Sequence, residues 1–545
     1  MEKRVIIAFV LSFVVLYAFR ALYSPPPTGQ EPQQAAQASP PSSQKAPVVP
    51  PLQQNVEAPE VAHAAEIQGG KTEDFTVDTP LYTAIVSNIG GVLKSYKLKD
   101  YTDGAGHSLE LINQSAPMQV GSPLAITTGD KTIDDQLAKA AFAGHREGDS
   151  LSLEFAGSGL YVRKDLAFDK DKYLFSLKAT VTKEGKPVPY SLVWQGVFGD
   201  QSIAQDVARK NAVYQSDVNA YKRVALRSLK DPQDFNSPRA GVEDQYFLAA
   251  FMFGMPEAVK IRKQEYNGPD GKPVPSLAVS YSVPQDTAIR IYVGPKQRQS
   301  LQQADPELYA ALDYGYFGFI AKPLLDILLW IHKYVGNFGW AIILLTVGLT
   351  LILFPLRLKQ QVSMLKMQKI QPHMRRLQDQ YKKLKASDPR RTQVQTDMMN
   401  LYKEHGVNPM GGCLPLLLQM PLLFAFYSAL GYSIELRRAP WIFWIKDLSQ
   451  PDPYYIIPIA MAVAMFAQQK LTPTPNVDPA QAKMMLVMPI VFTFMFLNYG
   501  SGLALYWLTS NIISVGQQIF INKYWSPQAE AKLRARPRPN EQQGT

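Results

Sequence analysis

The sequence of 545 residues contains only one cysteine, Cys413. A single cysteine cannot form an internal disulfide bond, so a large domain outside the cytoplasm would have to be stabilised by its hydrophobic core alone. Cys413 lies between Gly412 and Leu414 in an apolar run. Because free cysteine is usually a small buried residue, we interpret it as a packing residue rather than as a nucleophile or a ligand.

Signatures of covalent chemistry are also absent. The chain has no GxxxxGK[ST] phosphate-binding loop, and its apolar segments carry no acid/base dyad and no metal-binding cluster. His63, His107 and His145 are scattered with carboxylates through residues 60–150, without a spacing that suits a metal or acid/base catalysis. We therefore predict no catalytic residue, no metal and no cofactor, and we expect that the chain is not an enzyme.

The chain is basic, with a formal net charge of +10. Such a charge suggests a nucleic acid, an anionic lipid surface or a topology bias. No RNA- or DNA-binding signature accompanies it, and the basic residues cluster beside apolar segments. The pattern therefore favours a membrane protein without direct nucleic-acid recognition.

Six apolar runs are candidates for transmembrane helices. The first, Val5–Tyr23, could be a signal peptide, but it is long enough to cross a hydrocarbon core of about 30 Å and no small-x-small cleavage site follows it closely. We interpret residues 1–23 as a retained N-terminal membrane anchor. The other five predicted spans are Tyr334–Leu356, Gly412–Ser433, Tyr454–Gln468, Met484–Tyr499 and Leu503–Ile521.

The distribution of charge predicts the orientation of these spans. The loop 357–411 contains twelve Lys and Arg residues and only four Asp and Glu residues, and the tail 522–545 is also basic. Because cytoplasmic loops carry an excess of Lys and Arg, both segments and both termini should be cytoplasmic. The region between the first two spans is then outside, and the simplest compartment for it is the periplasm of a Gram-negative cell, with the spans in the inner membrane.

Three regions separate the first two spans. Residues 24–70 are rich in Pro, Gln and Ala, which predicts a disordered linker. Residues 71–305 contain short alternating segments such as KYLFSLKATV and AIRIYV, broken by turn residues, which indicates a β-sandwich domain. Residues 306–333 end in the apolar stretch Phe317–Lys333, whose charges share one helical face, so we predict an amphipathic helix in the outer membrane interface.

The predicted five-span core, residues 334–521, includes a cytoplasmic helical hairpin at 358–406. An apolar stripe with alternating spacings of three and four residues runs from Ile370 to Leu384, and Ser387-Asp388-Pro389 interrupts it. The stripe resumes from Val394 to His405. The outer face is basic, and two interpretations stay open: a docking platform for an acidic or nucleic-acid partner such as a ribosome, or a solvated face with ordinary cytoplasmic charge.

Three segments carry a resemblance to a known family. NPMGGCLPLLLQMPLLFAFYSAL, ELRRAPWIFWIKDLSQPDPYYIIPI and SGLALYWLTSNIISVGQQ resemble the YidC family of membrane protein insertases. The Gram-negative form of that family has an N-terminal anchor, a large periplasmic β-supersandwich domain and a five-span core. The resemblance therefore implies a multi-span α-helical membrane protein with six transmembrane helices, a β-supersandwich periplasmic domain and a cytoplasmic helical hairpin.

The resemblance also implies an activity and partners. Such proteins are insertases and folding chaperones that insert nascent membrane proteins into the inner membrane through a hydrophilic groove, alone or with the Sec translocon. The implied partners are nascent membrane proteins, the Sec translocon and the lipid bilayer. A ribosome bound at the hairpin and the basic tail is a further candidate partner.

The groove of the family carries an arginine on the second span, but this chain has Thr350 at the aligned position. Arg357 lies on the same helical face, about 10.5 Å nearer the cytoplasm. Arg357 could snorkel upward and supply the charge of the groove, or it could be a plain cytoplasmic anchor, and both interpretations stay open.

Four more residues complete the predicted groove. By the resemblance, Thr346 matches a polar groove position and Trp507 takes an aromatic position, while Gln419 and Asn511 are polar residues within apolar runs that should face protein or water. For these four residues, hydrogen bonds that only pack helices together are an equal alternative. The predicted substrate groove consists of Thr346, Thr350, Arg357, Gln419, Trp507 and Asn511.

Two other functions compete with insertion. A small-solute transporter would show repeated halves and paired helix breaks at the midplane, whereas this sequence has no internal repeat and its Pro421, Pro458 and Pro489 are not paired. A periplasmic carbohydrate-acting enzyme on a membrane base would need a catalytic pair, and none stands out in the sequence.

Overall fold

The computed structural model describes residues 66–114, 117–201, 210–217, 220–268, 271–385, 388–404, 414–472, 479–525 and 527. The chain divides into two units, of which the second is compact and comprises His63–Asn476 with Leu486–Thr545. Apart from the start of helix α11, all elements below belong to the second unit. The predicted anchor 1–23, most of the predicted linker, Cys413 and nearly all of the basic tail lie outside the described residues.

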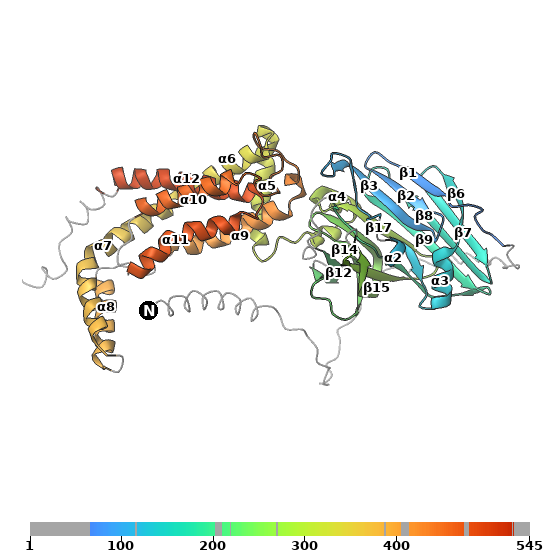
Figure 1. Ribbon diagram of the computed structural model, residues 1–545, viewed down its shortest axis with the longest axis horizontal. Coiled ribbons are helices and arrows are strands. Elements are labelled where there is room, and N and C mark those ends of the chain that lie inside the picture. The colour runs from blue at the N-terminus through green and yellow to red at the C-terminus, as the bar shows by residue number, and fades with distance from the viewer. Residues whose placement is uncertain are drawn as a thin grey trace, which may run out of the picture. The chain divides into compact units, whose positions relative to one another are not determined.

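A four-stranded antiparallel sheet opens the β-rich domain (Figure 1). Its strands run in the order β1 (Asp74–Asp78), β2 (Tyr82–Ser87), β3 (Val92–Thr102) and β4 (Ser108–Glu110). Alternate residues of β2, starting with Tyr82 and Ala84, are fully buried, as expected for a strand with one face on a core. Gly90 and Gly91 both have positive φ angles of 71° and 57°, which explains the glycines in the turn before β3.

A larger sheet of thirteen strands completes the domain in the described residues. Its main path runs β13, β12, β14, β15, β17, β9, β8, β7 and β6. The long strand β15 pairs with β14 over most of its length, with β17 at its start and with β16 towards its end. The predicted β-rich domain is thereby present, whereas its bounds of 71–305 and its supersandwich architecture stay predictions. The strands are β5 (Ala125–Thr127), β6 (Ala143–Glu147), β7 (Ser150–Gly157), β8 (Leu160–Phe168), β9 (Leu174–Lys183), β10 (Lys186–Pro187), β11 (Tyr190–Trp194), β12 (Asn211–Asp217), β13 (Ala220–Ala225), β14 (Gln233–Glu243), β15 (Phe247–Asn267), β16 (Pro273–Val283) and β17 (Ala288–Pro295).

The described end of the predicted linker differs from a free chain. Ile67 forms an antiparallel bridge with Ala156 at the end of β7, and the amide of Gly69 donates to the carbonyl of Ala141 at 2.9 Å. The packed domain therefore extends a few residues towards the N-terminus of the expected boundary at residue 71. These backbone hydrogen bonds could not be predicted from the sequence, because the linker was identified only by its high content of Pro, Gln and Ala.

One buried lysine stands out in the core of the β-rich domain. Lys164 on β8 is 1% exposed, and its Nζ donates to the carbonyl oxygens of Gly90 at 3.0 Å, Gly91 at 2.8 Å and Leu124 at 3.0 Å. Three carbonyl acceptors satisfy the three donors of an ammonium group. Burial nevertheless lowers the pKa of Lys164 to about 7.

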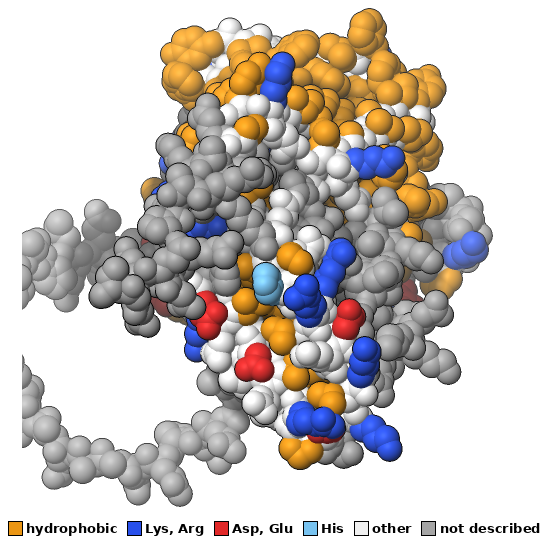
Figure 2. Space-filling model, turned by 90° about the vertical axis from the view of Figure 1, so that its left-hand side faces the viewer, with side chains coloured by type: hydrophobic (Ala, Val, Ile, Leu, Met, Phe, Trp, Pro, Cys, Tyr) orange, Lys and Arg blue, Asp and Glu red, His pale blue; other side chains and the backbone are white. Residues whose placement is uncertain are grey.

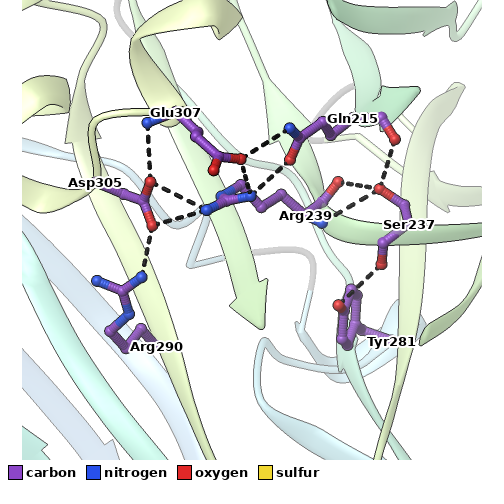
Figure 3. A network of polar contacts seen from close by, with 7 residues as sticks. All are labelled: Gln215, Ser237, Arg239, Tyr281, Arg290, Asp305 and Glu307. Atoms are coloured by element: carbon purple, nitrogen blue, oxygen red, sulfur yellow. Dashed lines mark hydrogen bonds and ion pairs between the residues drawn. The ribbon is translucent and has the colours of Figure 1, made fainter. Parts of the chain in front are cut away.

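A polar network joins the sheet to the segment that leads into the helices (Figure 3). Arg239 on β14 donates to both carboxylate oxygens of Asp305 at 3.1 Å, and its other terminal nitrogen reaches Glu307 and Gln215, each at 2.7 Å. Arg290 on β17 also donates to Asp305, at 2.5 Å. Hydrogen bonds between charged groups are among the stronger ones in proteins, so this network ties the connecting segment to two strands.

Helices make up the rest of the described chain (Figure 1). Helix α12 is central, because it contacts α6, α9 and α10. Two short helices, α2 (Pro117–Val120) and α3 (Lys131–Lys139), belong to the β-rich domain. The others are α4 (Arg298–Ala304), η2 (Leu308–Ala311), α5 (Gly318–Val335), α6 (Phe338–Ile352), α7 (Phe354–Lys383), α8 (Arg390–Glu404), α9 (Leu414–Tyr432), η4 (Ile434–Leu436), α10 (Ile456–Leu471), α11 (Pro479–Phe496), α12 (Ser501–Phe520) and η5 (Ile521–Trp525).

The predicted amphipathic helix is present as α5. Its buried face carries Leu324 and Leu328, while Phe319 and Trp330 on the other face are 73% and 61% exposed. The helix ends at Gly336, which adopts the left-handed conformation that favours glycine, with φ of 70°. The helix and its two faces agree with the sequence pattern, and its place in the membrane interface stays a prediction.

Within the described residues, no helix taken singly has both the length and the apolar composition of a membrane span, although the bent pair Phe338–Ile352 and Phe354–Gln368 has them together. Ile456–Leu471 and Val487–Phe496 are shorter apolar helices. The first predicted span lies outside the described residues. The count of six spans therefore stays a prediction.

Helices α7 and α8 lie side by side (Figure 1), and their assignment as the predicted cytoplasmic hairpin stays a prediction. The guanidinium of Arg391 on α8 stacks 4.3 Å from the ring centre of Tyr381 on α7. A groove between the helices is lined by residues of both, among them His373 and Asn400. Figure 2 shows basic side chains with acidic ones among them on the face of the molecule that includes α7 and α8.

Candidate functional site

The bend between α6 and α7 sets the geometry of the predicted groove residues. The two helices meet at 47° around Leu353, and Pro355 occupies the first turn of α7. Proline has no amide hydrogen to donate, so it interrupts the continuous hydrogen-bond ladder that would keep the helix straight. The bend separates Thr346 and Thr350, on α6, from Arg357, on α7.

Both threonines are buried and bonded to their own helix. Thr346 is 0% exposed and Thr350 is 6% exposed. The Thr346 hydroxyl donates to the carbonyl of Ile342 at 2.6 Å, and the Thr350 hydroxyl approaches the carbonyls of Thr346 at 2.8 Å and Val347 at 2.9 Å. Such bonds satisfy a hydroxyl within an apolar helix while leaving its oxygen able to accept another bond.

Arg357 points at α12 and is partly buried there. Its Nη1 donates to Oγ of Ser514 at 2.7 Å and to Oε1 of Gln517 at 2.9 Å. The amide nitrogen of Gln517 in turn donates to the carbonyl of Thr350 at 3.3 Å. Gln517 therefore bridges Arg357 and Thr350, the residue at the position where the family resemblance places an arginine. We call Thr350, Arg357, Ser514 and Gln517 the Arg357 cluster.

The other three predicted groove residues lie elsewhere on α9 and α12. Gln419 donates to the hydroxyl of Tyr506 at 3.0 Å, across the two helices. Asn511 is 9% exposed and donates to the carbonyl of Trp507 on its own helix at 2.8 Å. The structure thus joins Thr350 and Arg357 in one cluster, while Gln419 and Asn511 each have a separate partner.

Trp507 belongs to an aromatic layer between α9, α11 and α12. Its ring stacks with Phe492 at a centroid distance of 5.8 Å and contacts Phe496 at 5.6 Å, while Tyr506 stacks on Phe426 at 3.9 Å. The indole nitrogen of Trp507 is buried without a hydrogen-bond partner among the described residues. Aromatic stacking of this kind favours a packing role for the ring over direct hydrogen bonding.

Ser514 and Gln517 were not predicted from the sequence. Both belong to a row of polar residues at helical spacing on α12, which begins with Ser510. Ser514 accepts from Arg357 and donates to the carbonyl of Ser510 at 2.5 Å, so it uses both capacities of a hydroxyl. The spacing of Ser510, Ser514 and Gln517 within an apolar run was the available signal.

No cluster of three or more His, Cys, Asp or Glu side chains suited to a metal occurs in the part of the chain that the structure describes. The site consists instead of hydroxyl groups, amides and one guanidinium in a helical core. Such groups can solvate polar atoms of a bound chain and attract a carboxylate, and they can do so without bond-making chemistry.

Comparisons with known proteins agree with this architecture of a β-rich domain joined to apolar helices. Residues 330–529 match the family described as the 60Kd inner membrane protein, and residues 74–327 match the YidC periplasmic domain. The membrane protein insertase YidC of Pelobacter propionicus is 37% identical over 557 residues, covering 96% of this chain and 99% of that protein. The insertase YidC of Geobacter sp. strain M21 is 38% identical over 545 residues, with the same shares covered.

A solved structure of an active YidC insertase, with its first transmembrane domain resolved, is also similar. It covers 85% of this chain and 95% of that chain, with 20% sequence identity and a TM-score of 0.36. The matched regions define an inner-membrane protein with a periplasmic domain. The chain belongs to the YidC family of membrane protein insertases, as its resemblance predicted. The alternative of a small-solute transporter finds no support among these relatives.

Proposed function

We propose that this chain inserts nascent membrane proteins into the inner membrane, with the Arg357 cluster as the polar contact for the substrate. The observation that carries the proposal is the pair of hydrogen bonds from Arg357 to Ser514 and Gln517, at 2.7 Å and 2.9 Å. They hold a permanent positive charge against the central helix of the core. The insertase activity itself is supported by the sequence identity of this chain to proteins named as YidC insertases.

The work of such a site is physical rather than chemical. A charged side chain at the centre of a bilayer costs about 2.5 to 3.5 kcal/mol on insertion scales. A buried polar side chain such as Thr350 on α6, whose hydroxyl oxygen can still accept a hydrogen bond, offers a polar segment a partner that lipid cannot offer. Each contact lowers the barrier for moving that segment, while the apolar span of the substrate stays in lipid.

Arg357 would add direction to this process. A guanidinium group keeps its charge at any physiological pH and binds carboxylates strongly. Substrates whose translocated segment carries Asp or Glu should therefore engage the Arg357 cluster first. This favours the interpretation of Arg357 as the charge of the groove over that of a plain anchor, because a plain anchor would extend into water rather than toward α12.

Topology and partners complete the proposal. Both termini and the α7–α8 hairpin are cytoplasmic, the β-rich domain is periplasmic, and six helices span the membrane, as the charge asymmetry supports. The basic face of the hairpin and the tail 522–545 are the surfaces that a ribosome would use. The Sec translocon is the second proposed partner, for substrates with large translocated domains.

A pair of leucine substitutions on α12 tests the proposed groove. Ser514→Leu replaces a buried polar residue of the Arg357 cluster, whereas Ile512→Leu changes a residue that is 56% exposed on the same helix. In cells that depend on this chain, Ser514→Leu should reduce the insertion of a single-span reporter, measured by protease protection, and Ile512→Leu should match wild type. Equal insertion by both variants would contradict a role for the cluster.

A further inference from the structure

A cavity of about 370 Å³ lies between the β-rich domain and the helical core. Polar and charged residues of the β-rich domain form one wall, including Arg223, Glu243 and Gln245. The other wall is mostly apolar and aromatic, and it comes from the C-terminal end of α9 and the N-terminal end of α12, with Tyr432 and Leu503 among its residues. The cavity therefore presents one wall that suits polar atoms and one that suits apolar groups.

A buried ion pair holds the two walls together. Nε of Arg437, which follows η4 in the helical core, donates to Oδ2 of Asp200 in the β-rich domain at 2.9 Å. The two side chains are only 4% and 1% exposed. Arg437 also donates to the carbonyl of Thr102 at 3.0 Å, and Gln245 donates to the carbonyl of Gly431 at 2.5 Å. Separating the domain from the core would leave both charges of this buried ion pair without their partner, which is energetically costly. These contacts should therefore hold the domain in one position on the core.

The charges of the lining argue against a phosphate ligand. Arg223 contacts Glu243 at 2.7 Å and Asp313 at 3.2 Å, and Lys296 contacts Glu243 at 3.3 Å. Although burial alone would raise the pKa of Glu243, Lys296 and Arg223 lower it below its usual value. With Asp244 also in the lining, the acidic residues outnumber the basic ones, so the cavity offers no excess of positive charge to a lipid headgroup.

The cavity and the predicted groove lie at different levels of the same two helices. On α12, Leu503 of the cavity precedes Asn511 by about 12 Å along the helix axis. The stacked rings of Phe426 on α9 and Tyr506 on α12 lie at levels between them, and both are 1% exposed. A polypeptide segment that reaches the cavity has therefore passed the aromatic layer that separates it from the Arg357 cluster.

We propose that this cavity binds the polar polypeptide segment of a substrate that has just crossed the membrane, and that the Arg437–Asp200 pair is the positioning contact that keeps the β-rich domain over it. The inference rests on the insertase function proposed above. The lining contains side-chain amides, from Asn211, Gln245 and Asn498, which have the same kinds of donor and acceptor as a peptide backbone. Within the protein, the amide nitrogens of Asn211 and Gln245 donate to Glu243 and Gly431. The aromatic wall suits the apolar parts of the same segment.

Site-specific photocrosslinking in the full-length protein tests the site. A photoreactive residue replaces Tyr432 in the cavity, Ser514 in the Arg357 cluster, or Phe443, which is 79% exposed and does not line the cavity. The probe substrate is a ribosome-bound nascent chain with one span and a polar translocated tail. We expect the tail to crosslink at Tyr432 at least tenfold more than at Phe443.

Each remaining outcome has a defined meaning. Crosslinking at Ser514 without crosslinking at Tyr432 would overturn the cavity proposal and leave the proposed groove intact. Crosslinks from Tyr432 to lipid alone would also overturn it. Failure at both positions would refute the proposed function and, with it, the cavity proposal.

A charge-reversal series tests the positioning contact. Asp200→Arg and Arg437→Glu should each reduce crosslinking at Tyr432 about tenfold, and the double variant should recover it. Asp200→Asn, which keeps the shape and removes the charge, serves as the milder variant if a reversal prevents accumulation. Lys94→Glu disrupts the exposed ion pair with Asp74 and is the matched control, with no expected change. Unchanged crosslinking in Asp200→Asn and both single reversals would refute the positioning role.

Discussion

Replacing Arg357 with alanine is the most direct test of the proposed groove. The substitution removes the hydrogen bonds to Ser514 and Gln517 and the only charge of the Arg357 cluster. If Arg357 attracts the translocated segment of a substrate, the loss should depend on the charge of that segment. A reporter with a short acidic periplasmic tail should be inserted poorly, whereas a reporter with a neutral tail of equal length should be affected less.

The size of the effect follows from the surroundings of the charge. Arg357 is partly buried beside α12, so a carboxylate at about 4 Å would gain between about 1 kcal/mol in water and about 4 kcal/mol at an effective dielectric constant of 20. Since the site must admit water together with the substrate, we expect a value near the lower limit. About 1 kcal/mol corresponds to a roughly fivefold loss of insertion for the acidic tail.

Protease protection of the reporter, in cells that rely on the variant alone, measures this loss. Arg357→Lys keeps the charge without the planar fork that reaches two acceptors, so it should retain part of the activity. Thr350→Arg in the Arg357→Ala background returns a charge to the aligned position and should restore insertion of the acidic tail. Normal protection of that tail by Arg357→Ala would refute the substitute-arginine hypothesis and favour a neutral groove.

Three further predictions concern stability and topology. Burial lowers the pKa of Lys164 to about 7, below that of a lysine in the unfolded chain, so the unfolded state binds more protons than the folded state above pH 7. The melting temperature of the detergent-solubilised protein should therefore rise by a few degrees from about pH 7 to pH 9. Lys164→Met should flatten this rise. Asn337 caps α6 by accepting from two backbone amides at 3.0 Å and 3.2 Å, so Asn337→Ala should destabilise the protein by about 1 kcal/mol in the same melting assay, whereas Asn337→Asp, which keeps a capping oxygen, should cost less. Single cysteines at positions 387 and 449, in a background without Cys413, should react with a membrane-impermeant thiol reagent from opposite sides of the membrane, and labelling of both from the same side would refute the predicted topology.

Local patterns in the sequence predicted the elements well where one periodicity persisted. The predicted stripe that begins at Ile370 lies on α7, with Leu384 just beyond the end of that helix, and the break at Pro389 immediately precedes α8. The helix predicted at Phe317–Lys333 appears as α5 with nearly the same ends. In each case neighbouring residues along the chain carry the information, so packing against distant parts is not needed to read it.

The site required information that no local pattern contains. Arg357 and Ser514 are 157 positions apart, and they meet near the start of α7, just beyond the bend after α6. Asp200 and Arg437 are 237 positions apart and belong to regions that the sequence predicted as separate domains. Each of these residues alone resembles an ordinary polar residue near a helix end or a turn. Only the packing of helices and sheets identifies their partners.

If Arg357 supplies the groove charge in place of position 350, its location has a consequence for substrates. Arg357 follows Thr350 by seven residues and lies beyond the bend after α6, so its charge would be nearer the expected cytoplasmic side than a charge at position 350. An acidic tail would then meet Arg357 early, before it passes the aromatic layer around Trp507. In the Arg357→Ala, Thr350→Arg variant the charge lies deeper, and a tail must reach farther to contact it. Insertion by this variant should therefore improve with tail length more steeply than insertion by the wild type. A series of reporters with acidic tails of increasing length measures both slopes, and equal slopes would refute the idea that the depth of the charge controls engagement.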